Sequence, residues 1–191
     1  MTCIIKKISI IIPCYNSDKY LEDAIKSVLN QSYKKFDLYL VNNGSVDKSL
    51  DIMQKYKIKD KRIYIINYKK KTPKGKSINN LLNEVKTKWV SILDADDIYF
   101  KNKIKYQINF LQKNNNVKLL SCLGTYTLDG ISTFGTTNNP FKNLKSCFNI
   151  INEYKNIGVL APGVIFDKDV VIKIGGIRYK YWPSDDLDLS N

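Results

Sequence analysis

Three aspartates follow a short apolar run near the middle of this 191-residue chain. The run, Trp89 to Leu93, is typical of a buried strand, and Asp94, Asp96 and Asp97 come directly after it. Carboxylates crowded at a strand end repel each other and are costly to desolvate unless a positive charge lies among them. The simplest such charge is a hard cation, Mn²⁺ or Mg²⁺, which binds one or two carboxylates and otherwise takes water and phosphate oxygens. The segment therefore predicts a metal site for a phosphorylated ligand, with a solvated acidic turn as the alternative for so short a motif.

The acidic segment is one of several polar segments that follow predicted strands. Apolar runs predict four strands, at residues 8–12, 36–41, 63–68 and 89–93. Segments with helical spacing separate them. The first helix begins at Ser17 or Asp18, Ser45 is expected to cap the second, and the third follows the basic loop 69–76. Their apolar faces would comprise Leu21, Ala24, Ile25, Val28 and Leu29, then Ile52, Met53 and Tyr56, then Ile78, Leu81, Leu82 and Val85.

This alternation predicts an α/β fold with a doubly wound, mostly parallel sheet. Ligands of such sheets bind beyond the carboxyl ends of the strands. The loops after Ile12, Val41 and Leu93 all follow strands. We therefore expect these three loops to meet at one edge of the sheet.

The second part of the chain is less regular. We expect a helix at 102–111, a strand at 117–123, a loop or hairpin at 126–139, a strand at 161–166, and a short helix at 167–174 that Gly175 and Gly176 end. A further helix is expected to begin at Ser184. One domain over residues 1–191 accounts for all these elements.

The net charge of +13 comes from 31 basic and 18 acidic residues. Such a balance suits a phosphate-bearing substrate or loose attraction to an anionic membrane surface. Nucleic acid is not expected, because only Arg62 and Arg178 are arginines, and arginine makes the bidentate contacts of nucleic-acid recognition. The richness in lysine, isoleucine and asparagine also suits a coding bias toward A and T.

Targeting and redox features are few. No apolar run approaches the length of a membrane span, and no apolar signal region precedes the first predicted strand. Cys3, Cys14, Cys122 and Cys147 lack the spacing of metal ligands. We expect reduced thiols in a cytoplasmic protein, with peripheral contact at a membrane surface left open.

Five motifs occur in order along the chain. They are Ser9–Asn16, Tyr20–Ser32, Val41–Ser49, Leu93–Asp97, and the pair Gly175–Arg178 and Ser184–Leu189. Together they resemble the family-2 glycosyltransferases, enzymes with the GT-A fold that transfer a sugar from a nucleotide-sugar with inversion. They match, respectively, the family's opening strand with its P-x-Y-N loop, its first helix, its V-D-D-G-S-x-D segment, its metal motif, and its G-G-F and E-D segments.

The resemblance implies a role for each motif. The first half, 1–97, would bind the nucleotide-sugar, and 98–191 would form the acceptor side. The donor-binding residues would be Pro13, Tyr15, Asn16, Asn42, Asn43, Lys76 and Asp94. Asp96 and Asp97 would hold the metal. Asp186 matches the catalytic base, and Asp185 and Trp182 would contact the glycan or lipid-linked acceptor. Without the resemblance, Asp185 and Asp186 are carboxylates favoured by a helix dipole.

Three departures from the family pattern stand out. The acidic pair of the family is Asn42-Asn43 here, which changes the hydrogen bonds offered to a nucleobase. The helix before the metal strand lacks the family's arginine, so Lys74 or Lys76 would have to supply charge to the phosphates. The chain ends at Asn191, directly after the matched base, so we expect the C-terminal half to be incomplete.

Two other functions remain as alternatives. A sugar-nucleotide pyrophosphorylase would need a glycine-rich loop after the first strand, and Pro13-Cys-Tyr-Asn16 is not one. A catalytically impaired nucleotide-sugar or glycan-binding relic of the same fold is favoured by Asn42-Asn43 and by the abrupt end. Product release from a donor and acceptor pair distinguishes the relic from a transferase.

Overall fold

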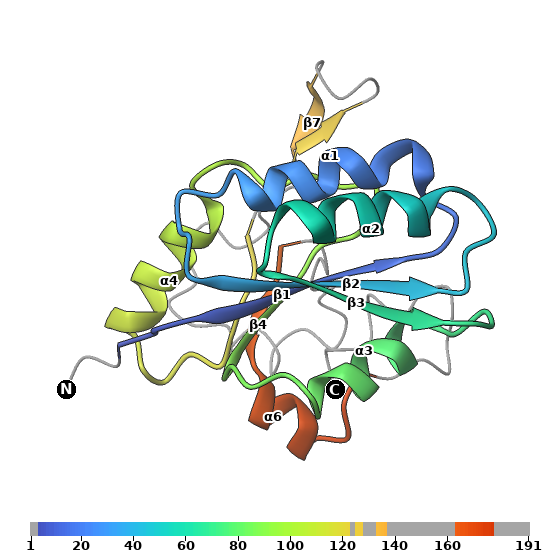
Figure 1. Cartoon of the computed structure of the whole chain (residues 1–191). Coiled ribbons are helices and arrows are strands. Elements are labelled where there is room, and N and C mark those ends of the chain that lie inside the picture. Colours follow the sequence, from blue (N-terminus) through green and yellow to red (C-terminus); the bar gives the residue numbers. More distant parts are fainter. Residues whose placement is uncertain (1–3, 123–124, 128–132, 137–162, 178–191) are drawn as a thin grey trace.

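The computed structural model describes residues 4–122, 125–127, 133–136 and 163–177. Its strands are β1 (Ile8–Cys14), β2 (Phe36–Asn43), β3 (Ile63–Tyr68), β4 (Trp89–Ile92), β5 (Leu119–Leu120), β6 (Thr125–Thr127), β7 (Thr133–Thr136) and β8 (Ile165–Asp167). Its helices are α1 (Asp18–Leu29), α2 (Ser49–Lys59), α3 (Lys74–Leu82), α4 (Lys103–Lys113) and α6 (Lys168–Lys173). The fold is the expected α/β arrangement around one mostly parallel sheet (Figure 1).

The six strands of this sheet follow the order β3-β2-β1-β4-β8-β5. The first four are parallel, as predicted, whereas β8 runs antiparallel to β4 and β5. Pro13 of β1 lies opposite Val41 of β2, and Ile11 lies opposite Ile92 of β4. The carboxyl ends of the three motif-bearing strands therefore lie at the same edge of the sheet.

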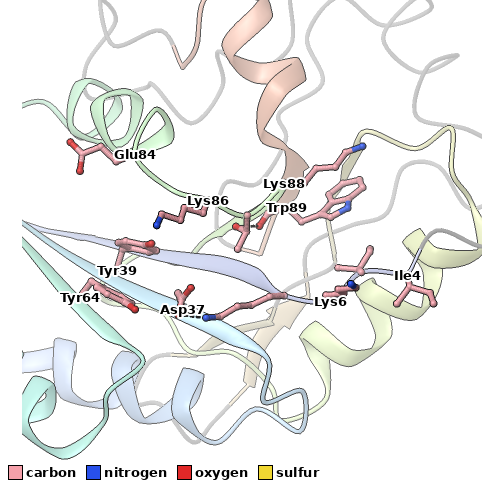
Figure 2. Close-up of a pocket in the computed structure, with 12 residues that line it drawn as sticks. Ile4, Lys6, Asp37, Tyr39, Tyr64, Glu84, Lys86, Lys88 and Trp89 are labelled. Carbon is pink, nitrogen blue, oxygen red and sulfur yellow. Dashed lines mark hydrogen bonds and ion pairs between the residues drawn. The ribbon is translucent and has the colours of Figure 1, made fainter.

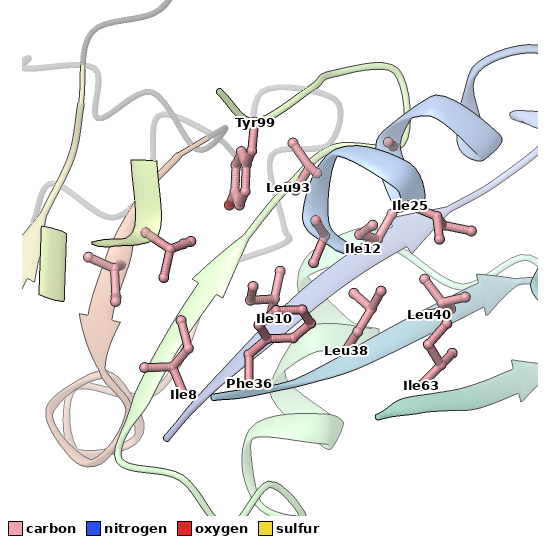
Figure 3. Close-up of a cluster of buried hydrophobic side chains, with 14 of the residues drawn as sticks. Ile8, Ile10, Ile12, Ile25, Phe36, Leu38, Leu40, Ile63, Leu93 and Tyr99 are labelled. Atoms are coloured by element: carbon pink, nitrogen blue, oxygen red, sulfur yellow. The ribbon is translucent and has the colours of Figure 1, made fainter. Parts of the chain in front are cut away.

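Two hydrophobic layers hold the sheet between its helices. The layer toward α1, α2 and α4 is built on alternate residues of the central strands, among them Ile10, Phe36 and Leu38, which are fully buried (Figure 3). The opposite layer, toward α3 and α6, includes Ile11 and Val90. Because the central strands are covered on both faces, most of their residues are apolar, with Ser9, Asp37 and Ser91 among the exceptions. This composition is why these strands could be predicted from the sequence.

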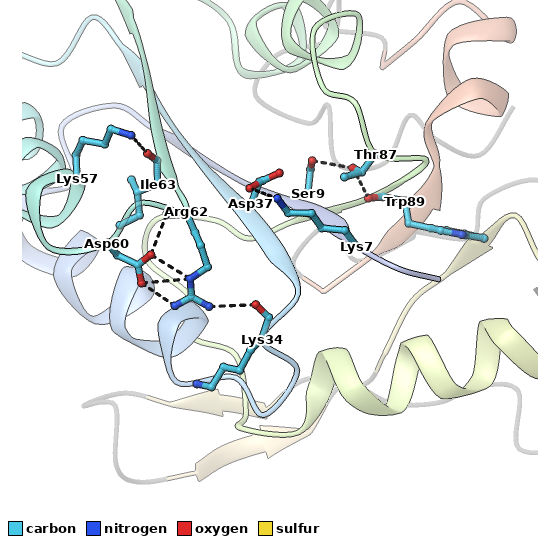
Figure 4. A network of polar contacts seen from close by, with 10 residues as sticks. All are labelled: Lys7, Ser9, Lys34, Asp37, Lys57, Asp60, Arg62, Ile63, Thr87 and Trp89. Atoms are coloured by element: carbon cyan, nitrogen blue, oxygen red, sulfur yellow. Dashed lines mark hydrogen bonds and ion pairs between the residues drawn. The ribbon is translucent and has the colours of Figure 1, made fainter. Parts of the chain in front are cut away.

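Polar contacts hold the amino ends of the strands, on the edge opposite the motifs (Figure 4). The guanidinium of Arg62 pairs with Asp60 at 2.6 Å, donates to the carbonyl of Lys34 and lies 4.3 Å from the ring centroid of Phe36. The hydrogen bonds between the Arg62 and Asp60 side chains hold the pKa of Asp60 below its ordinary value and raise the pKa of Arg62. Arg62 is therefore a structural residue, remote from the motif-bearing edge.

Some predicted elements differ in the structure. Ser45 does not cap the second helix: α2 begins at Ser49, with Lys48 at its N-cap, and the Ser45 hydroxyl accepts a hydrogen bond from Asn16 instead. Of the predicted strand at 117–123, the described residues 117–122 form a strand only at Leu119–Leu120, the two residues that pair with β8. The 126–139 segment contains the paired strands β6 and β7, so the hairpin alternative applies there.

Candidate functional site

The loops after β1 and β2 are joined to each other by side chains. The backbone N–H of Asn16 donates to Ser45 Oγ at 3.0 Å, and Asn16 Oδ1 accepts from the N–H of Val46 at 2.9 Å. Asn16 adopts a φ of 50°, a left-handed conformation that asparagine tolerates better than most residues. Tyr15, immediately before it, is 37% exposed, while Pro13 is buried. The P-x-Y-N segment therefore fixes the loop and leaves its tyrosine accessible.

A second pair of contacts links the same loops. Asp47 accepts from the N–H groups of Asp18 and Ser49, both at 3.0 Å, and Asp18 accepts from the N–H of Lys48 at 3.5 Å. Partial burial acts against the charged form of Asp47, but hydrogen bonds from Ser49 and Asp18 hold its pKa below the ordinary value. The beginnings of α1 and α2 are thus held side by side without a ligand.

The two asparagines at the end of β2 have different environments. The amide of Asn42 donates to Asn67 Oδ1 at 2.8 Å and accepts from the N–H of Ser45 at 2.9 Å. Asn43 is only 3% exposed, and its Oδ1 is buried without a hydrogen-bond partner among the described residues. A buried polar atom without a partner is costly, so this oxygen is the one suited to a ligand donor.

Gly44 lets the end of β2 pack against the loop before α3. Its φ is +85°, and a Cβ built there would lie 2.5 to 2.8 Å from backbone atoms of Lys70 and Lys71. The N–H of Thr72 donates to the Asn43 carbonyl across this contact at 3.3 Å. The Lys71 ammonium lies 4.6 Å from the Tyr15 ring centroid, so the same loop brings positive charge to the accessible tyrosine.

Gly44→Ala is expected to lower the free energy of unfolding by about 2 kcal/mol or more, since the left-handed conformation alone costs roughly 1–2 kcal/mol for a residue with a Cβ. Gly175→Ala is the matched control, because Gly175 has a φ of +97° and nothing within 4 Å of a built Cβ. Thermal melting of both variants isolates the steric contribution. Equal destabilisation would show that the contact with Lys70 and Lys71 adds nothing.

The acidic segment forms a turn at the end of β4. The N–H of Asp97 donates to the Asp94 carbonyl at 3.2 Å, Asp94 is half-buried and Asp96 is exposed. The ammonium of Lys74, the first residue of α3, lies 2.8 Å from Asp94 Oδ1 and 3.1 Å from Oδ2. Within the described residues no three acidic, cysteine or histidine side chains converge as a ready metal cage. The positive charge expected at Asp94 is therefore present as a lysine.

A divalent cation still fits the oxygens of this turn. Mg²⁺ and Mn²⁺ sites that serve phosphates use one or two carboxylates, with water and phosphate supplying the other ligands. Asp96 is exposed at the carboxyl edge, close in sequence to the half-buried Asp94 and Asp97. These hard oxygen donors are the type that Mg²⁺ and Mn²⁺ prefer.

A buried polar network lies next to the acidic turn and joins the end of β4 to residues 99 and 103. The Tyr99 hydroxyl donates to the Ile92 carbonyl at 2.6 Å and lies 2.9 Å from Ser91 Oγ, which also accepts from Lys103 Nζ at 3.2 Å. Burial raises the pKa of Tyr99 and lowers that of Lys103 to about 7. The sequence did not predict this network. Tyr99 and Lys103 belong to no motif, and their positions in the sequence do not distinguish them from ordinary surface residues.

The remaining predicted site residues divide into two groups. Lys76 is exposed on the first turn of α3. Trp182, Asp185 and Asp186 lie outside the described residues. Asn67 was missed by sequence reasoning, although its place opposite Asn42 at the end of the neighbouring strand was a usable signal.

An open groove lies at the opposite, amino edge of the sheet (Figure 2). It is lined by lysines and by the stacked rings of Tyr39 and Tyr64, whose centroids are 5.1 Å apart. Of the site residues predicted from the sequence, none in the described part of the chain lines it. The sequence motifs therefore point to the carboxyl edge of the sheet.

Comparisons with known proteins agree with this arrangement. The model of Glycosyl transferase family 2 matches residues 9–161. An uncharacterized glycosyltransferase of Rickettsia prowazekii is 38% identical over 122 residues, which cover 64% of this chain and 37% of that protein. The putative teichuronic acid biosynthesis glycosyltransferase TuaG of Bacillus subtilis is 32% identical over 108 residues, covering 56% of this chain and 43% of that one.

Solved structures show the same fold. The structure of S. aureus TarS 1-349 in complex with UDP superposes with a TM-score of 0.75 at 23% identity, covering 95% of this chain and 53% of that one. The mannosyltransferase PcManGT from Pyrobaculum calidifontis, in complex with GDP-Man and Mn2+, gives a TM-score of 0.69 at 16% identity, covering 94% and 49%. The chain thus spans about half of these structures and about two fifths of the curated relatives.

Proposed function

The chain belongs to glycosyltransferase family 2 and has the GT-A fold, and from this we propose that it transfers a sugar from a nucleotide-diphosphate-sugar donor to an acceptor hydroxyl, with inversion, in glycan or polysaccharide synthesis. The observation that carries the proposal is the alignment of β1, β2 and β4, which brings the loops bearing Tyr15, Asn43 and Asp94 to one edge. UDP and GDP-Man in structures of the same fold support a nucleotide-sugar donor. The TuaG similarity supports a polysaccharide product.

The donor would lie across the carboxyl edge. Tyr15 and Asn43 would hold the nucleoside, and Asp94 would bind the ribose or the sugar. Asp96 and Asp97 would hold a divalent cation, a role supported by the presence of Mn2+ in the complex of the mannosyltransferase PcManGT. When bound, such a cation neutralises charge on the departing diphosphate.

Transfer requires one proton acceptor. The acceptor hydroxyl oxygen would attack the anomeric carbon while the bond to the diphosphate breaks on the opposite side, and Asp186 would take the hydroxyl proton. The chain contains no histidine, so a carboxylate is a natural choice for this base. Asp185 and Trp182 would position the glycan or lipid-linked acceptor.

The donor proposal is tested by calorimetry of the protein with UDP, GDP, CDP and dTDP in the presence of Mn²⁺. Transfer is tested by supplying a nucleotide-sugar donor with a panel of acceptors and measuring the nucleoside diphosphate that is released. Binding without release would favour the alternative, an impaired nucleotide-sugar-binding relic. Absence of binding to every nucleotide would contradict both.

Asn43→Asp is expected to raise the affinity for GDP relative to UDP and CDP by about tenfold, because a good bidentate pair discriminates by about 1–3 kcal/mol. A carboxylate only accepts hydrogen bonds and suits the adjacent N–H donors of guanine, whereas an amide also donates to the carbonyl of uracil or the ring nitrogen of cytosine. Calorimetry with the three nucleotides measures the ranking.

Asn42→Asp is the control for this variant. In the wild-type protein Asn67 Oδ1 accepts a hydrogen bond from the Asn42 amide, and in the variant a carboxylate oxygen would face it instead. We therefore expect lower thermal stability and an unchanged order of affinities for the three nucleotides. An unchanged ranking in Asn43→Asp would mean that this side chain does not touch the base.

We propose a cytoplasmic location with peripheral membrane contact. No helix among the described residues has the length and apolarity needed to cross a bilayer. Tyr106 and Phe110 are 68% and 46% exposed on one side of α4, with Lys105 and Lys113 exposed nearby, which supports contact with an anionic lipid surface. Equal sedimentation with anionic and neutral vesicles would argue against it.

A further inference from the structure

The contact between Lys74 and Asp94 is an ion pair at the centre of the proposed donor site. The ammonium touches both carboxylate oxygens, at 2.8 and 3.1 Å, and the two side chains are only 17% and 21% exposed. Lys74 is the first residue of α3, and Asp94 follows β4 directly. The pair thus connects the start of a helix to the strand end where the acidic turn begins.

Such a pair constrains what can bind there. Separating two partly buried charges is costly unless each finds a new partner, because an unpaired charge loses its hydration without compensation. A donor whose ribose or sugar hydroxyls bind Asp94 must leave Lys74 with another anion. A diphosphate beside the ribose is such an anion.

Three other cations of the described residues are less well placed for the diphosphate than Lys74. Arg62 is committed to Asp60 at the amino edge. Lys71 lies over the ring of Tyr15, where it faces the nucleoside side, and Lys76 is exposed. Lys74 combines partial burial with contact to the acidic turn.

We propose that Lys74 is the diphosphate-binding residue of the donor site and that it exchanges partners, from Asp94 in the free protein to the donor diphosphate in the complex. This inference rests on the proposed function. Lysine suits the exchange, because its flexible stem carries a compact charge that can move between neighbouring anions. Lys74 and a divalent cation at Asp96 and Asp97 would repel each other until the diphosphate arrives, after which both would contribute to binding it.

Calorimetry tests the exchange with three probes: UDP and GDP with Mn²⁺, their parent nucleosides uridine and guanosine, and Mn²⁺ alone. Lys74→Gln should weaken diphosphate binding about tenfold or more, since a hydrogen bond to a charged group contributes roughly 1.5–3 kcal/mol. Nucleoside binding should stay within about twofold, and Mn²⁺ alone should bind more tightly because a positive charge next to its site is gone. Lys74→Arg should restore most of the diphosphate affinity.

Lys7→Gln is the matched control. It removes one positive charge and breaks a lysine–aspartate pair of 2.7 Å with Asp37 at the opposite edge. It should leave all three measurements unchanged. A double variant, Lys74→Gln with Asp94→Asn, removes the carboxylate charge that the single variant leaves behind and provides a soluble reference should Lys74→Gln fold poorly. Compared with Asp94→Asn alone, it should lose diphosphate affinity while its nucleoside affinity stays within about twofold.

Equal weakening of nucleoside and diphosphate binding would overturn the inference and leave Lys74 a purely structural residue. Unchanged binding in Lys74→Gln would overturn it as well. Both results leave the proposed function standing, because the wild-type protein still binds the nucleotide. Failure of the wild-type protein to bind either diphosphate would instead refute the proposed function itself.

Discussion

Asp186→Asn is expected to reduce turnover about a hundredfold or more while leaving donor binding nearly intact. Asparagine preserves the shape of the side chain but cannot take a proton from the acceptor hydroxyl. The expectation applies to protein that shows transfer of the sugar in the release assay. Rapid measurement of nucleoside diphosphate release gives the turnover, and calorimetry with the donor nucleotide gives the affinity.

Two outcomes would contradict this assignment. Full turnover in Asp186→Asn would show that another group takes the proton, and loss of donor binding would show that Asp186 contacts the donor. Asp185→Asn and Asp188→Asn would then be the next variants, because both residues lie on the same short segment. Asp188→Asn also serves as the charge-matched control in the first experiment.

Removing divalent cations should weaken nucleoside diphosphate binding about tenfold or more. Two unit charges 4 Å apart near a protein surface interact by about 4 kcal/mol before desolvation is subtracted. If even half of this interaction energy remains after desolvation, the nucleotide affinity changes more than tenfold. Calorimetry with Mn²⁺, with Mg²⁺ and with chelator measures the difference. Asp96→Ala should abolish it, because the exposed carboxylate of the turn is then gone.

Asp23→Ala provides the comparison for Asp96→Ala. Asp23 is 74% exposed on α1, so its removal changes the net charge equally without touching the turn. It should keep the full effect of the cation. Equal nucleotide affinity with cation and with chelator in the wild-type protein would rule out the metal role.

The central strands were predictable because they are buried on both faces. Residues 8–12, 36–41 and 89–93 are mostly apolar, and their lengths match β1, β2 and β4 to within about two residues. Their parallel order followed from the helical segments between them. The antiparallel direction of β8 could not be predicted, because the sequence of a three-residue strand does not show from which end the chain enters the sheet.

The site was predictable where it depends on neighbours in sequence and not where it depends on contacts between loops. The position of Asp94 at a strand end was visible in the sequence. Its pairing with Lys74 was not, because it depends on where α3 begins relative to the end of β4. The different environments of Asn42 and Asn43 likewise arise from Asn67 on a separate strand and from the packing of Gly44.

The position of β8 between β4 and β5 has a consequence for synthesis on the ribosome. The four parallel strands that carry the three loops are complete once Ile92 has emerged, but β8 begins only at Ile165. Until then the outer edge of β4 presents unpaired backbone N–H and C=O groups, and β5 has no neighbour to join. The nascent chain therefore carries four parallel strands with an open strand edge for much of its translation. That edge is where chaperone binding or pairing with a second nascent chain would be concentrated.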